Sequence, residues 1–279
     1  MRVPKHLHAA LFVVVIAITA AGCSAIDDAR GVADTVDEAV ELLDTIEQNS
    51  AWDTIADGLE NLDSQDAGYR ATIRIQAGPA DEAGEFTGAL SDDMTIDLRV
   101  DARGASLARV TRGGVLQDFH IEPTGDRPTV YEVTDGQYLC ADDGGLFHDG
   151  LASVFADYAL GASGAHLLSV ATEVEGDAIV AGRDATPYEL ESRVADALAV
   201  LETFGNPDLQ ARLDEAERFA LVGDLHLDDE TGALLALASD TTNLTGGERT
   251  AFRFEITQWG NVPDIPQPAA AEIAQPCTN

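Results

Sequence analysis

The spacing of apolar residues changes from a helical period to a strict alternation at about residue 69. Between residues 32 and 43, and again between 52 and 62, apolar side chains recur every three or four positions on an acidic background. This spacing is typical of amphipathic helices. From Tyr69 onward apolar and polar residues alternate, as in Tyr69–Gln76. Alternation predicts strands with one buried and one solvated face, which is the habit of antiparallel sheets.

The alternation continues along most of the remaining chain. Turn residues such as Gly113-Gly114, Asp135-Gly136 and Asp229–Gly232 separate the segments, which indicates a meander of short hairpins. Helical spacing returns at residues 151–158 and 194–201. The pattern therefore predicts an α+β fold: a broad, curved antiparallel sheet, a half-barrel of roughly 9–11 strands, with helices covering its concave face.

The N-terminal segment has the pattern of a secretion signal. Arg2 and Lys5 precede an uncharged apolar run from Ala9 to Ala21. A helix over this run would rise only about 20 Å, against a hydrocarbon core of about 30 Å. Small residues lead to Cys23, which predicts a lipid-attachment cysteine after cleavage at residue 22. The alternative is ordinary cleavage near the same place. We expect export and lipid anchoring at the outer face of the cell membrane.

The charge of the chain is strongly negative. Its formal net charge is −34, and loss of Arg2 and Lys5 with the leader makes it −36. Such a surface makes nucleic acid a poor partner. The bias is compatible with a high-salt habitat or with composition and solubility alone. We interpret it as a solvated coat and not as a site.

Two cysteines remain when Cys23 is assigned to lipid. Cys140 and Cys277 in an exported protein predict one disulfide, which would hold the C-terminal tail. The alternative is a pair of free buried thiols. A metal pair is disfavoured because neither cysteine has a histidine or a second cysteine at ligand spacing.

The sequence lacks the usual catalytic signals. The histidines are scattered, and there is no His-Glu-x-x-His helix, no Gly-x-Ser-x-Gly elbow and no glycine-rich phosphate loop. We therefore expect no catalytic residues, no metal, no cofactor and no enzyme activity.

Several phrases, taken in their order, resemble one known superfamily. They are Val180–Leu190 (VAGRDATPYEL), Leu227–Gly232 (LDDETG) and Val262–Pro268 (VPDIPQP), preceded by the leader, Cys23, a helix and the strand meander. In this order the chain is similar to LolA and the mycobacterial LppX and LprG lipoproteins. The resemblance implies a half-barrel wrapped around helices, with an apolar cavity that takes acyl chains.

Residues 1–22 are then a signal peptide, residues 23–49 a lipidated tether with an N-terminal helix, and residues 50–279 a single half-barrel domain. The first hypothesis is an anchored envelope lipoprotein that binds or transfers a lipid or other hydrophobic ligand. The alternative is a structural, sensory or assembly lipoprotein that acts through its acidic surface, with an envelope protein as partner. Residues on dry strand faces and inner helix faces are the candidates for the cavity lining. They are Ile73, Ile96, Leu98, Phe119, Leu151, Phe155, Leu198, Leu201, Phe252 and Phe254.

Overall fold

The computed structural model describes most of the chain after the leader. The residues described are 40–42, 44–81, 85–123, 128–141, 145–147, 151–159, 169–193, 196, 219–243 and 247–277. Cys23 lies outside them, and so does the helix expected at residues 194–201 apart from residue 196. Within the first helix expected from the sequence, residues 40–42 are helical, and residues 44–48 continue the helix.

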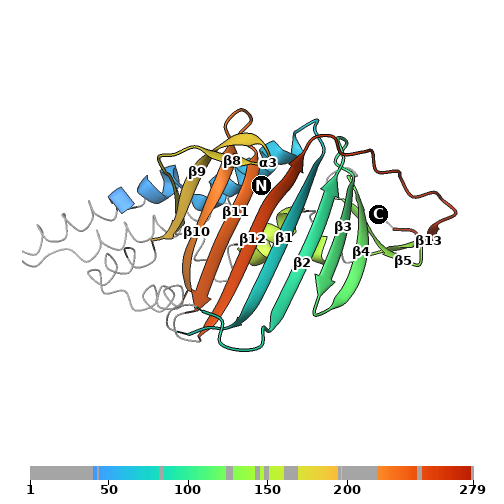
Figure 1. Ribbon diagram of the computed structural model, residues 1–279, viewed down its shortest axis with the longest axis horizontal. Helices are drawn as coiled ribbons and strands as arrows, with labels where there is room; N and C mark the ends of the chain where they lie inside the picture. Colours follow the sequence, from blue (N-terminus) through green and yellow to red (C-terminus); the bar gives the residue numbers. More distant parts are fainter. Residues whose placement is uncertain are drawn as a thin grey trace, which may run out of the picture.

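One large sheet dominates the fold (Figure 1). Its strands are β1 (Tyr69–Pro79), β2 (Asp92–Val100), β3 (Ser106–Arg112), β4 (Val115–Glu122), β5 (Thr129–Thr134), β6 (Gln137–Cys140), β7 (Ser169–Glu173), β8 (Ala178–Val180), β9 (Arg183–Ser192), β10 (Phe219–Asp228), β11 (Leu234–Asn243), β12 (Glu248–Trp259) and β13 (Ile273–Gln275). Across the sheet the order is β13-β6-β5-β4-β3-β2-β1-β12-β11-β10-β9-β7, with β8 paired to β9. The described strands therefore form an open, curved sheet, and the predicted half-barrel class is confirmed.

The alternation predicted from sequence determines which face is dry. In β1 the buried residues are every second one from Tyr69 to Ile75, and their β12 partners Phe252, Phe254 and Ile256 are also buried. The central strands β2, β1, β12 and β11 pair antiparallel, so these apolar rows line up across the sheet. The result is one continuous apolar face.

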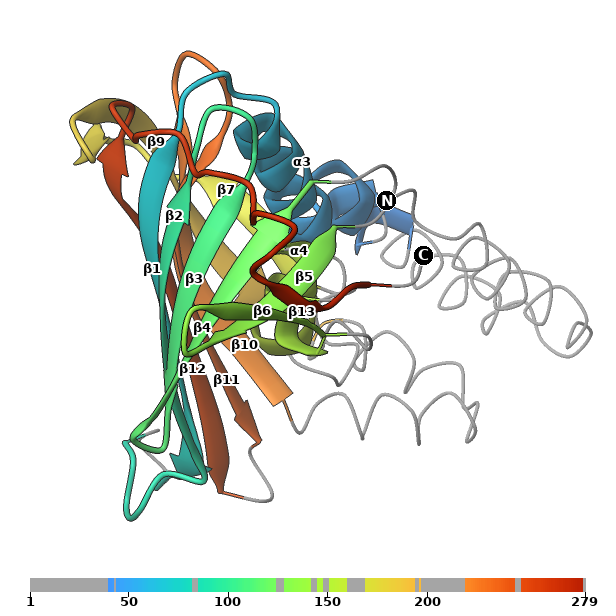
Figure 2. The same cartoon turned by 90° about the vertical axis from the view of Figure 1, so that its right-hand side faces the viewer.

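Helices pack on that dry face (Figure 2). They are α3 (Ala51–Asp63), α4 (Leu151–Val154), the 3-10 turn η1 (Gly145–Phe147) and the π-helical turn η2 (Phe155–Ala159). Ser50 begins α3, because its Oγ accepts the backbone N–H of Asp53 at 3.2 Å. A side chain at Gly58 would lie 3.0 Å from Leu227, so the glycine lets α3 approach the sheet closely.

The C-terminal tail crosses the ends of the central strands to reach the far edge of the sheet (Figures 1 and 2). β13 pairs with β6, and this pairing is parallel. A disulfide joins Cys140 to Cys277 with their Cα atoms 5.0 Å apart, as the cysteine count predicted. The tail is thus attached covalently at the edge strand.

The described sheet has 13 strands, more than the roughly 9–11 expected. The local pattern does not indicate β3, because Ala108 and Ser106 occupy dry positions and weaken the apolar alternation. The pattern does not indicate β13 either, which is a three-residue strand in a proline-rich tail, paired with β6 beside the disulfide. Both are cases in which pairing partners, and not local pattern, make the strand.

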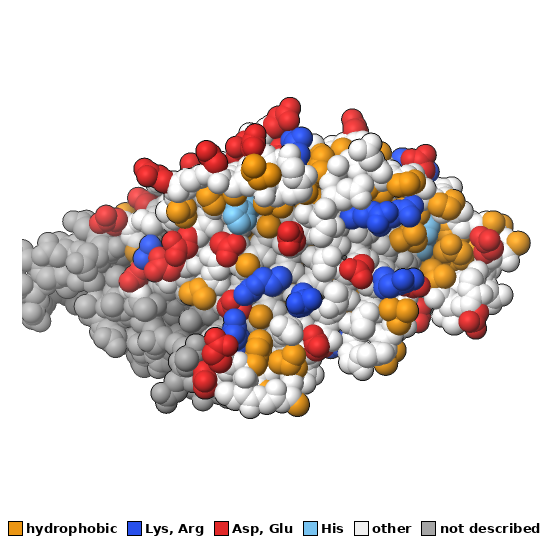
Figure 3. Space-filling model, viewed as in Figure 1, with side chains coloured by type: hydrophobic (Ala, Val, Ile, Leu, Met, Phe, Trp, Pro, Cys, Tyr) orange, Lys and Arg blue, Asp and Glu red, His pale blue; other side chains and the backbone are white. Residues whose placement is uncertain are grey.

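The outer face of the sheet is solvated and carries charges of both signs (Figure 3). Arg109 on β3 pairs with Asp118 on β4 at 2.8 Å, and Arg253 on β12 pairs with Asp240 on β11 at 2.7 Å. These cross-strand pairs neutralise part of the acidic charge locally. The outer sheet face is therefore a mixed surface within a strongly acidic protein.

Candidate functional site

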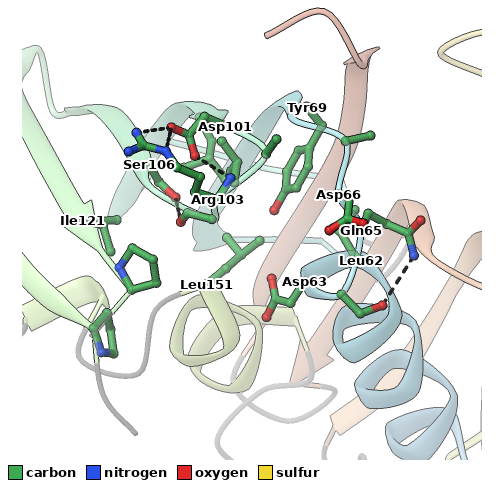
Figure 4. A pocket seen from close by; sticks show the side chains of 18 of the residues that line it. Leu62, Asp63, Gln65, Asp66, Tyr69, Asp101, Arg103, Ser106, Ile121 and Leu151 are labelled. Carbon is green, nitrogen blue, oxygen red and sulfur yellow. Dashed lines mark hydrogen bonds and ion pairs between the residues drawn. The ribbon is translucent and has the colours of Figure 1, made fainter. Parts of the chain in front are cut away.

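A cavity of about 390 Å³ lies at one end of the dry face (Figure 4). It is located where α3 ends and β1 begins, and the facing wall comes from the end of β2, the start of β3 and the end of β4. Phe147 of η1 and Leu151 of α4 complete the lining. The cavity thus occupies the part of the apolar face that lies between the end of α3 and the start of α4.

The body of the cavity is apolar. Leu62 of α3, Leu98 of β2, Ile121 of β4 and Phe147 are all buried, and each contributes to the wall. These residues also belong to the hydrophobic core, so the cavity wall is continuous with the core. Packed side chains hold such a wall in place, as in preformed ligand pockets.

One rim of the cavity is the turn between β2 and β3. The Asp101 carboxylate is buried and accepts the backbone N–H groups of Arg103 at 2.8 Å and of Ala105 at 3.1 Å. It also accepts the N–H of Ile265 in the C-terminal tail at 2.8 Å and a guanidinium hydrogen of Arg103 at 2.8 Å. Burial by itself would raise the pKa of Asp101, but these hydrogen bonds outweigh it and lower the pKa. This rim is therefore rigid and its charge is already paired.

The opposite rim is the end of α3 and the start of β1. Burial raises the pKa of Asp63, the last residue of α3. Burial also raises the pKa of Tyr69, and the nearby Asp63 carboxylate raises it further. Figure 4 shows the Tyr69 ring along the wall with its hydroxyl toward Asp63. A phenol and a carboxylate therefore share this rim of the cavity, while Asp101 and Arg103 belong to the other rim.

The residues predicted to line a cavity divide into three groups. Leu98 and Leu151 line this one, and Phe119 packs edge-on against the lining residue Phe147 at 5.5 Å between ring centroids. Five others lie fully buried in the core and away from this lining: Ile73, Ile96, Phe155, Phe252 and Phe254. Leu198 and Leu201 lie outside the described residues.

Sequence reasoning did not single out the polar residues of the cavity. Asp63 directly follows the last apolar residue of α3. Tyr69 is the first residue of the first alternating strand, and its side chain belongs to the buried face of that strand. The sequence signal that could have indicated them is the presence of polar residues where the helix ends and the first strand begins. Nothing in the sequence pattern indicated that the tail would fix Asp101.

The part of the chain that the structure describes contains neither a metal-ligand cluster nor a membrane-spanning helix. No group of three or more histidine, cysteine, aspartate or glutamate residues is placed to hold a metal ion in this part of the chain. No helix within the same residues is long and apolar enough to cross a membrane.

Comparison with known proteins gives structural matches only. No protein-family model matches the chain, and no curated protein does. The lipoprotein LppX of Mycobacterium tuberculosis matches with 11% identity and a TM-score of 0.38, over 76% of this chain and 96% of its own. LprF of Mycobacterium bovis matches with 13% identity and a TM-score of 0.40, over 78% of this chain and 96% of its own.

A LolA superfamily protein of Nitrosomonas europaea also matches, with 8% identity and a TM-score of 0.29, over 78% of this chain and 95% of its own. All three TM-scores are below 0.5. The functional argument therefore rests on the cavity of this chain.

Proposed function

We propose that this chain is an envelope lipoprotein that holds a lipid or other hydrophobic ligand in the cavity at the end of its half-barrel. One observation carries the proposal: a cavity of about 390 Å³ with an apolar body and a polar rim. Its volume lies within the range of about 300–1,000 Å³ that is usual for small-molecule pockets. An apolar chain placed there would gain about 0.8 kcal/mol for each methylene removed from water.

The leader and Cys23 are the basis for placing the protein at the membrane surface. Attachment of acyl chains at Cys23 would keep the domain beside the bilayer, where hydrophobic ligands enter and leave. Residues 23–49 would act as the tether and residues 50–279 as the ligand-holding domain. Such an anchor favours local loading, holding or sensing over long-range transport.

The test is to fill the cavity and look for loss of bound ligand. Ser106 lines the cavity and is buried at the start of β3, so Ser106→Trp would occupy this space. Leu116→Trp is the matched control, because Leu116 is 57% exposed on the neighbouring strand β4. Full-length protein would be extracted from membranes in mild detergent and examined by native mass spectrometry.

We expect an amphiphile bound to the wild type and to Leu116→Trp, and little or none bound to Ser106→Trp. Circular dichroism should give the same strand content for all three proteins. The proposal fails if the wild type carries no ligand, or if a folded Ser106→Trp variant carries as much as the control.

A further inference from the structure

The charged residues that line the cavity are mostly acidic. Asp63, Asp66 and Asp101 face Arg103, the one basic residue among the described lining residues, which leaves an excess of two negative charges. The whole chain adds a net charge of −34 to this local excess. A ligand that enters the cavity therefore meets a negative field.

Arg103 is already paired with a carboxylate of the same rim. Its Nη2 donates to Asp101 at 2.8 Å and also to the backbone carbonyl oxygen of Ile265, while its Nε donates to Asp101 at 3.3 Å. These contacts tie the guanidinium to the rim and neutralise it. Arg103 thus closes the turn, and its charge is balanced by Asp101.

The Asp63 carboxylate and the Tyr69 hydroxyl, by contrast, have no hydrogen-bond or ion-pair partner among the described residues, although the Tyr69 ring stacks on Trp259. Tyr69 is only 3% exposed, and its hydroxyl forms no hydrogen bond there although it lines the cavity. The Asp63 carboxylate likewise forms no hydrogen bond or ion pair with a described residue, and this exposed side chain lies at the rim of the cavity. The Tyr69 ring is buried while its hydroxyl lines the cavity, so the hydroxyl can donate or accept a hydrogen bond with a ligand there.

The position of Asp63 in its helix strengthens the inference. Asp63 is the last residue of α3, and the last turn of this helix contains no basic residue. The C-terminal end of a helix carries partial negative charge, so a carboxylate is unfavourable there. Helix stability therefore does not account for this side chain.

We propose that the ligand of this cavity is an amphiphile with a protonated amine head, bound by Asp63 and Tyr69, with its apolar body against Leu98 and Ile121. This inference rests on the function proposed above and specifies its ligand class. An ammonium group has several N–H donors, so Asp63 can accept one of them while the Tyr69 hydroxyl accepts another. A carboxylate or phosphate head would instead be repelled by Asp63 and Asp66.

Photoreactive decyl probes that differ only in the head group would test this ligand class. The amine, alcohol and carboxylate forms would be crosslinked to the full chain in membranes, and the labelled peptides would be identified by mass spectrometry. We expect the amine probe to label the segments around Asp63 and Leu98 at a half-saturating concentration about tenfold lower than the alcohol probe. The carboxylate probe should bind most weakly.

Two variants assign the preference to its residue. Asp63→Asn keeps the side-chain shape and should remove the difference between the amine and alcohol probes, while labelling by the alcohol probe persists. Asp57→Asn is the control, because Asp57 is exposed on the same helix and lies outside the cavity lining. It should leave the preference intact.

The possible results separate the two proposals. Equal labelling by the amine and alcohol probes, or an amine preference that survives Asp63→Asn, would overturn the assigned head group and leave hydrophobic binding intact. If no probe labels the cavity, the proposed function itself is wrong.

Discussion

Replacement of Asp228 by asparagine should destabilise the protein through a single buried ion pair. The Asp228 side chain is 1% exposed at the turn between β10 and β11. Its Oδ2 accepts the Nε–H of Arg183 at 2.6 Å, and its Oδ1 accepts a hydrogen from the Arg183 Nη2 at 2.7 Å. Oδ1 also accepts the backbone N–H of Thr231 at 2.9 Å and the Thr231 hydroxyl hydrogen at 2.8 Å. One carboxylate therefore joins β9 to the β10–β11 hairpin.

The expected cost follows from the perturbed ionisation. The hydrogen bond from Arg183 outweighs burial and, with those from Thr231, lowers the pKa of Asp228 from 3.8 to about 2. A shift of this size is worth about 2 kcal/mol of preference for the ionised form in the folded state. In Asp228→Asn an amide N–H group would also face the Arg183 donors. We expect a loss of about 3 kcal/mol in the free energy of unfolding.

A matched pair on the surface provides the control. Asp118 accepts hydrogen bonds from the Nε and Nη2 atoms of Arg109 at 2.8 Å and 3.2 Å, but the two side chains are 40% and 58% exposed. Solvent screens this pair, so Asp118→Asn should cost less than about 1 kcal/mol. Urea unfolding followed by tryptophan fluorescence would measure both variants, with the midpoint and slope fitted separately.

The pH dependence gives an independent check. Because the pKa of Asp228 is lower in the folded state, its stabilisation is complete above the unfolded value of 3.8 and is lost as pH falls toward about 2. The difference between wild type and Asp228→Asn should stay constant from neutral pH down to about pH 5 and shrink below that. A cost no larger than that of Asp118→Asn, or a difference that grows on acidification, would refute the reasoning.

Three further changes test the sheet, the core and the tail by chemical unfolding. Gly223→Ala would place a Cβ atom 2.0 Å from the backbone oxygen of Ala238 in β11, so we expect a loss above about 3 kcal/mol, whereas Gly88→Ala meets nothing within 4 Å and should be near neutral. A similar cost for both would contradict this. Phe155→Ala should cost about 3–5 kcal/mol, because it empties a fully buried position, and a cost below 1 kcal/mol would mean that the site collapses. Cys277→Ser opens a disulfide that spans 137 residues and should cost about 5 kcal/mol by chain entropy, and an unchanged midpoint would show that non-covalent contacts suffice.

The sequence predicts the sheet well wherever strong alternation meets a clear turn. β1 and β12 carry large apolar residues on one parity and pair along their length, so the local pattern and the final register agree. β3 could not be recognised in the same way, because its dry positions include Ser106 and Ala108, which become buried only through their neighbours. A strand of this kind is specified by pairing and not by its own residues.

The cavity is less predictable than the fold for a different reason. A dry strand face supplies the same residue types to a filled core and to a binding site, so Ile73 and Leu98 look alike in the sequence. The structure places Ile73 in the core and Leu98 on the cavity wall. The two residues differ in role because only Leu98 lies beside the cavity at the end of α3. That placement depends on long-range packing and not on the strand pattern.

The polar end of the cavity is fixed by contacts of both short and long range. Only residues 64–68 connect α3 to β1, so Asp63 and Tyr69 come together through the local turn. The turn can pass this close to β2 because residue 68 is glycine. A Cβ atom at this position would lie 2.7 Å from the backbone oxygen of Val100. The Gly68 carbonyl in turn accepts the N–H of Gly260 at 2.7 Å, where the tail leaves β12. The tail that holds Asp101 on one rim therefore also holds the turn on the other, so both rims depend on a single segment.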